Sequence, residues 1–120
     1  MNHNEISRHR GLAAASLRLP EMAIPAFNEG LEGLSGAPSK RRAYTLGKLA
    51  EVYFQTGDVD QACDLASEAF TMAAQLGYTE TVMAIRNARA QLTQMSTTQA
   101  VRELDERLLS TLLSLPAVHA

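Results

Sequence analysis

The sequence predicts an all-α fold made of about three stacked antiparallel helix pairs. A weak internal repeat places Ala23, Ala62 and Ala100 at corresponding points, 39 and 38 residues apart, each near the start of an amphipathic stretch. The composition agrees, because hydrophobic residues make up 46% of the chain while aromatic residues make up only 5%. Small apolar side chains let helix axes approach closely, and a helical period of this size is typical of repeat proteins.

The bulk properties predict one domain over residues 1–120, with repeats at about residues 4–35, 39–77 and 79–115. A net charge of −2 argues against a protein that coats nucleic acid. Cys63 is the single cysteine, and we expect it to be a small core residue rather than a reactive thiol. The sequence contains no apolar run long enough to span a bilayer and no signal-peptide pattern at its start, so we expect a cytoplasmic protein with no membrane partner.

The first half of the sequence predicts two helices followed by a loop. The first covers about residues 5–17, and the second begins at Pro20, which suits an opening turn. Apolar residues then recur at spacings of three and four as far as Leu34. Pro25 should kink this second helix or alter its first turn, because proline cannot donate an intrahelical hydrogen bond. The Gly and Pro residues of segment 35–39 predict a loop.

Two further helices follow this loop, at about residues 40–56 and 58–77. Gly57 is expected to end the first of them, and Asp58 with Gln61 reads as a capping box that starts the next. Gly77 is expected to end the second.

The last two helices are predicted from Thr79 to about residue 95 and from a second capping box at residues 96–99 to about residue 115. The final helix carries a wide apolar stripe, which either packs on the fifth helix or buries a second copy of the protein in a homodimer. The residues expected on this dimer face are Leu104, Leu108, Leu109, Leu112 and Leu115.

The middle repeat carries a pattern that resembles the tetratricopeptide repeat family. The matching positions are Leu46, Leu49, Ala50, Tyr53, Gly57, Asp58, Ala62, Ala66 and Ala69. The resemblance implies a right-handed superhelix in which the first helix of each pair lines a concave groove for a protein or peptide. Carried onto this chain, it implies a groove lined by Arg8, Leu12, Tyr44, Lys48, Glu51, Phe54, Val82, Arg86 and Arg89.

Phe54 has two interpretations at this stage. It lies on a different face from Leu49 and Tyr53, so it is either an exposed aromatic anchor among cationic residues or a side chain packed between repeats.

A second resemblance concerns the stretch from Gly57 to Cys63 together with Arg86, Arg89 and residues 100–108. These segments are similar to the C-terminal regions of actinobacterial helix-turn-helix regulators. Because no helix-turn-helix segment precedes the repeats, direct nucleic-acid binding is not carried over.

We therefore expect a non-catalytic, regulatory module that binds a protein or peptide. The alternative is a ligand-sensing transcriptional regulator, or a fragment of one, whose DNA-binding domain lies elsewhere. A small α-helical enzyme is the third candidate. The sequence contains no catalytic motif and no metal-ligand spacing, so no catalytic residue, metal or cofactor is expected.

Overall fold

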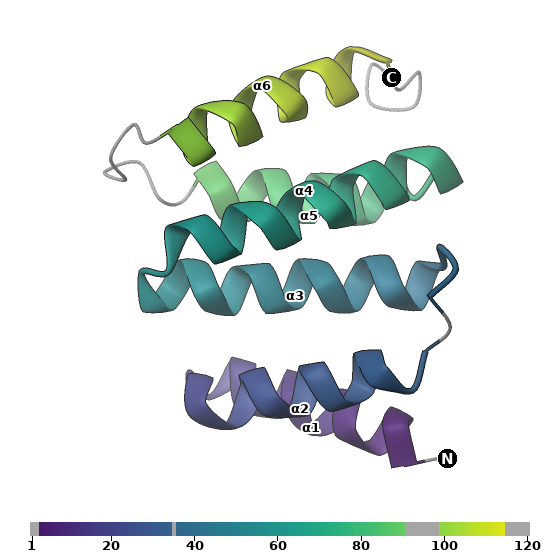
Figure 1. Cartoon of the computed structure of the whole chain (residues 1–120), viewed down its shortest axis with the longest axis vertical. Helices are drawn as coiled ribbons and strands as arrows, with labels where there is room; N and C mark the ends of the chain where they lie inside the picture. Colours follow the sequence, from purple (N-terminus) through teal and green to yellow (C-terminus); the bar gives the residue numbers. More distant parts are fainter. Residues whose placement is uncertain (1–2, 35, 91–98, 115–120) are drawn as a thin grey trace.

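The computed structural model describes residues 3–34, 36–90 and 99–114. Its described secondary structure is entirely helical, which confirms the all-α prediction. Figure 1 shows the helices as successive layers, from α1 and α2 at one end to α6 at the other. The six helices are α1 (His3–Ser16), α2 (Pro20–Glu32), α3 (Lys40–Thr56), α4 (Val59–Leu76), α5 (Thr79–Ala90) and α6 (Gln99–Ser114).

The ends of α3 and α4 are fixed by capping residues. Ser39 precedes α3 and its Oγ accepts a hydrogen bond from the backbone N–H of Arg42 at 3.1 Å. Asp58 caps α4 in the same way, since its Oδ1 lies 3.4 Å from the backbone nitrogen of Gln61. Gly57 and Gly77 end the two helices with φ of 87° and 74°, a region that favours glycine. The predicted boundaries at these positions are confirmed, whereas the second capping box at residues 96–99 falls largely outside the described residues.

Helix α2 continues through Pro25 rather than ending there. Pro25 lacks the N–H that would reach the carbonyl of Glu21, one turn earlier. Both residues are exposed, so water can satisfy that carbonyl. The helix therefore tolerates the proline on its solvent side.

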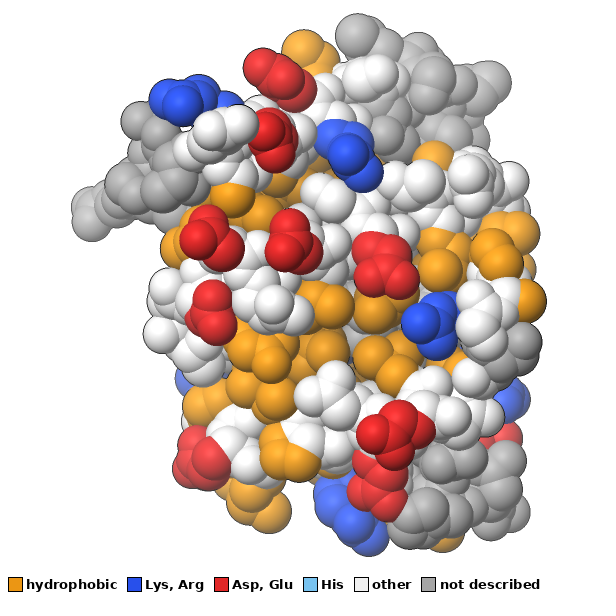
Figure 2. All heavy atoms as spheres, in the orientation of Figure 1, with side chains coloured by type: hydrophobic (Ala, Val, Ile, Leu, Met, Phe, Trp, Pro, Cys, Tyr) orange, Lys and Arg blue, Asp and Glu red, His pale blue; other side chains and the backbone are white. Residues whose placement is uncertain are grey.

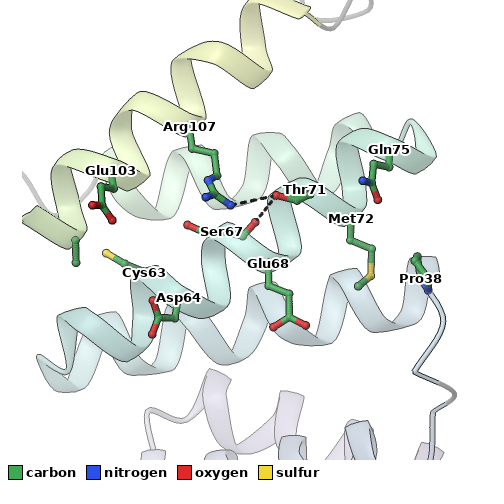
Figure 3. Close-up of a pocket in the computed structure, with 11 residues that line it drawn as sticks. Pro38, Cys63, Asp64, Ser67, Glu68, Thr71, Met72, Gln75, Glu103 and Arg107 are labelled. Carbon is green, nitrogen blue, oxygen red and sulfur yellow. Dashed lines mark hydrogen bonds between the residues drawn. The ribbon is translucent and has the colours of Figure 1, made fainter.

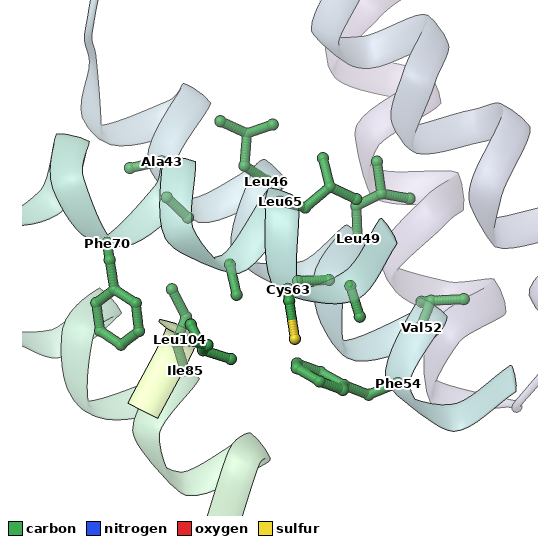
Figure 4. Packing of buried hydrophobic residues seen from close by; sticks show 14 of the residues in the cluster. Ala43, Leu46, Leu49, Val52, Phe54, Cys63, Leu65, Phe70, Ile85 and Leu104 are labelled. Atoms are coloured by element: carbon green, nitrogen blue, oxygen red, sulfur yellow. The ribbon is translucent and has the colours of Figure 1, made fainter. Parts of the chain in front are cut away.

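The close pairing of α3 with α4 forms the centre of the core. The two helices are joined by the short turn at Gly57 and Asp58 and run antiparallel (Figure 1). Their contact is rich in alanine, with Phe70 filling the space toward the later helices (Figure 4). The buried alanines of this pair are Ala43, Ala50, Ala62, Ala66, Ala69 and Ala73. Helices α1 and α2 form a second close pair and reach α3 mainly through α2.

Helix α6 packs mainly on α4 among the described residues. Val101 and Leu104 are almost fully buried there. The link from α6 to α5 includes a two-point ion pair, in which Arg89 donates to the two carboxylate oxygens of Asp105 at 2.9 and 3.0 Å. Neither predicted location for the last apolar stripe, helix five or a second copy, anticipated this packing on α4.

None of the helices within the described ranges combines the length and the apolar composition needed to cross a bilayer.

The crossing of α1 and α2 depends on Gly11. A Cβ atom at this position would lie 2.8 Å from Cδ1 of Phe27, whose ring is fully buried. We expect Gly11→Ala to lower the free energy of unfolding by roughly 1–2 kcal/mol in urea denaturation, because the steric conflict outweighs the gain in helix propensity. Gly36→Ala is the control, since a Cβ there meets nothing within 4 Å and stability should stay nearly constant. Equal stability of the two variants would contradict the packing described here.

Candidate functional site

Two hollows lie side by side along α3. One, of about 410 Å³, opens between α3 and α5, and the other, of about 370 Å³, opens between α1 and α3. Tyr44, Lys48 and Glu51 line both hollows and form a ridge between them. We call the two hollows and this ridge the α3 groove. Its remaining lining residues are Leu12, Ala15, Ser16, Lys40, Gly47, Val52, Gln55, Glu80, Thr81, Ala84 and Ile85.

The ridge combines an exposed aromatic ring with charged side chains. Tyr44 is 41% exposed, and Lys48 Nζ lies 5.6 Å from the centre of its ring. Lys48 also pairs with Glu51 at 3.4 Å. Contacts of this kind at the surface are worth about 0.5–1 kcal/mol each, so they orient the ridge without fixing it rigidly. With two lysines and two glutamates among its lining residues, the α3 groove is balanced in charge.

Four of the predicted groove residues line these hollows: Leu12, Tyr44, Lys48 and Glu51. The interpretation of Phe54 as an exposed anchor is wrong. Its side chain is only 5% exposed and lies beside Cys63 in the core (Figure 4). Phe54 follows Ala50 by one helical turn, so it shares the face of α3 that packs on α4.

The other four predicted groove residues lie elsewhere. Val82 is fully buried, and Arg8 packs its Cβ near Gly30, at the crossing of α1 and α2. Arg89 is paired with Asp105, and Arg86 is exposed on α5 without lining either hollow.

The groove residues that the sequence analysis missed on α3 are Lys40, Gly47, Val52 and Gln55. Lys40 and Gln55 are the polar ones. Lys40 and Gln55 form one stripe with Tyr44, Lys48 and Glu51, at spacings of four, four, three and four residues. The residue four positions after Glu51, Gln55, lies on the groove face of α3. The residue three positions after Glu51, Phe54, lies on the core face, and choosing it produced the error.

Two of the three described side chains of the proposed dimer face on α6 are buried within the chain itself. Leu104 is fully buried and Leu108 is 7% exposed, because both pack on α4. Leu109 is 61% exposed and remains accessible. The side chain of Leu112 and the whole of Leu115 lie outside the described residues.

A third hollow, of about 510 Å³, lies between α4 and α6. Figure 3 shows side chains from the outer face of α4 and the facing side of α6 around it. Arg107 donates to Thr71 Oγ1 at 3.4 Å, and the Thr71 hydroxyl donates to the backbone carbonyl of Ser67 at 3.0 Å. The lining residues are Pro38, Cys63, Asp64, Ser67, Glu68, Thr71, Met72, Gln75, Ala100, Glu103 and Arg107.

Cys63 lies on the floor of this α4–α6 hollow and is 3% exposed, as expected of a core cysteine. Burial raises the pKa of its thiol to about 11. The Arg89 cation opposes this rise, and the carboxylates of Asp60, Asp105 and Asp64 add to it. A buried thiol with a raised pKa is a poor nucleophile. Within the described residues, no group of three or more His, Cys, Asp or Glu side chains is arranged to hold a metal ion.

Charge is divided between alternate helices. Helices α1, α3 and α5 carry eight Lys or Arg and three acidic residues, a net charge of +5. Helices α2, α4 and α6 carry two Arg and nine acidic residues, a net charge of −7. Figure 2 shows acidic side chains on one face, around a band of apolar surface. The molecule therefore presents electrostatically different surfaces.

Comparisons with protein-family models, curated proteins and solved structures found no significant match.

The two aromatic residues on α3 allow a test of this assignment. We expect Phe54→Ala to lower the free energy of unfolding by about 3–5 kcal/mol, because it leaves a cavity in the core. Tyr44→Ala should cost less than about 1 kcal/mol, because that ring is partly exposed. Urea denaturation monitored by circular dichroism measures both values, and similar losses would contradict the placement of the two rings.

The Cys63 thiol provides a second test. Raising the pKa from 9.0 to about 11 leaves about a hundredfold less thiolate at pH 8. Reaction with a disulfide reagent should therefore be slow in the folded protein and fast in denaturant. The folded-state pKa of the thiol lies above the unfolded one, so the folded protein holds this proton more tightly. The contribution of the protonated thiol to the free energy of unfolding is complete below pH 9 and declines as the pH rises toward 11. Rapid native reaction at pH 8 would contradict the burial of the thiol.

Proposed function

We propose that this chain is a tetratricopeptide-like, non-catalytic module that binds a segment of a protein or a peptide in the α3 groove and has a regulatory role. The observation that carries the proposal is the position of two hollows on either side of an exposed Tyr44 ridge. Both hollows are lined by the first helices of the predicted pairs. An aromatic side chain at the centre of a binding surface is a frequent source of binding energy at interfaces.

The burial pattern of the middle repeat supports the tetratricopeptide-like arrangement. Leu46, Leu49 and Ala50 on α3 and Ala62 and Ala66 on α4 are all buried at the positions carried over from the family pattern. The turn glycine, Gly57, has the left-handed backbone conformation expected between two helices.

The geometry of the groove favours an elongated ligand. The two hollows lie on opposite sides of α3, and packed helices have axes roughly 8–10 Å apart. A ligand that fills both must cross α3 and place side chains at each end of that span. A peptide segment meets this requirement with two apolar residues and a polar backbone between them.

A selection from random peptides displayed on phage, each of about 16 residues, tests the proposal. Peptides retained by the wild-type protein should lose at least about tenfold in affinity, roughly 1.4 kcal/mol, on Tyr44→Ala. Fluorescence anisotropy with synthetic copies of the selected peptides measures this change.

Leu109→Ala is the matched control, because Leu109 is an exposed apolar residue on α6 that lines none of the three hollows. Its affinity for the same peptides should equal that of the wild type. Peptides that bind the Tyr44→Ala protein as tightly as the wild type would refute the α3 groove as the binding site.

A further inference from the structure

We infer that the α4–α6 hollow is a second docking site, for a basic, amphipathic segment of a partner protein. This site lies on other elements than the α3 groove and does not depend on the function proposed there. The inference rests on the shape of the hollow, the exposed carboxylates at its edge and the charge of the two helices that form it.

The shape of the hollow suits a side chain projecting from a partner. At about 510 Å³ it is larger than either hollow of the α3 groove, at about 410 and 370 Å³. Its apolar lining is made of Pro38, Cys63, Met72 and Ala100, contributed by the segment before α3, by α4 and by α6. Burying an apolar side chain of the partner against this surface would favour binding. A cationic segment without apolar residues would lack this contribution.

The outer side of α4, next to the hollow, carries a row of carboxylates. Asp60, Asp64 and Glu68 follow one another at intervals of four residues, so they form a stripe of like charge on the outer side of α4. All three are exposed, and none forms an ion pair with another described residue. Like charges at this spacing destabilise a helix. Asp60 lies in the first turn of α4, where a negative charge is favourable, but no ion pair with a described residue offsets the repulsion between Asp64 and Glu68. The cations of a basic partner would be attracted to these carboxylates and would reduce the repulsion between them.

The one cation that lines the hollow does not neutralise this stripe. Arg107 donates to Thr71 Oγ1, and its guanidinium forms no ion pair with another described residue (Figure 3). Glu103 accepts a hydrogen bond from Gln99 at 2.9 Å, which leaves its charge on the α6 side of the hollow. The rim of the hollow therefore carries three carboxylates, those of Asp64, Glu68 and Glu103, and one arginine.

The two helices that form the hollow strengthen the same field. Helix α4 carries three acidic and no basic residues and α6 carries three acidic residues and two arginines, a net charge of −4 that attracts cations before contact. At the floor of the hollow, burial is the main cause of the raised pKa of Cys63, and the carboxylates of Asp60 and Asp64 add to it. Complementary charge favours a basic segment here and disfavours an acidic one.

The test uses two fluorescein-labelled amphipathic peptides of about 14 residues, one of Leu and Lys and one of Leu and Glu in the same heptad pattern. Fluorescence anisotropy with the wild-type chain should show binding of the Leu/Lys peptide and at least about tenfold weaker binding of the Leu/Glu peptide. The double variant Asp64→Lys/Glu68→Lys should reduce affinity for the Leu/Lys peptide at least about tenfold.

The control variant is Glu21→Lys/Glu32→Lys on α2, which changes the net charge by the same amount on residues outside the three hollows. It should lower affinity by no more than about threefold, through the weaker general field. Circular dichroism verifies that both variants remain folded. Equal losses in the two variants would show attraction by net charge alone, and absence of Leu/Lys binding would reject the site outright. Because neither variant alters Tyr44, failure here leaves the test of the α3 groove unaffected.

Discussion

The close approach of α3 and α4 is the constraint on which the rest of the structure depends. Alanines on both helices, such as Ala50 and Ala66, leave little side-chain volume between the two axes. The other helices then pack against this pair, α2 on α3, α5 on both and α6 on α4. Each of the three hollows is lined in part by α3 or α4, so the pair sets their positions as well as the core.

The helical period explains which parts of this arrangement the sequence could predict. Local signals fixed the ends of α3 and α4, because a capping side chain or a glycine acts within one turn of its own position. The groove face of α3 was predicted in part, since Tyr44, Lys48 and Glu51 follow one stripe, yet Phe54 was wrongly added to it. A shift of one residue on a helix turns a side chain by about 100°, which is enough to move it from solvent into the core.

Other features depend on contacts between segments distant in the chain. The apolar stripe of α6 indicated that something must cover it, but no local pattern identifies α4 as that surface. The burial of Leu104 and the accessibility of Leu109 follow only from this docking. The division of charge between alternate helices can be counted from the sequence once the helix boundaries are known. Only the structure shows that the acidic side chains of α2, α4 and α6 lie on one face (Figure 2).

The tight α3–α4 pair also determines the distance between ligands that bind on its two helices. The α3 groove is centred on α3 and the carboxylate stripe is on α4, with the alanine-rich contact between them. Two ligands held on these helices would be separated by roughly two helix diameters, about 20 Å. Because close-packed interiors resist compression, that separation would stay nearly constant during thermal motion. The helix pair would then act as a rigid spacer, presenting two partners to each other in one fixed relative orientation.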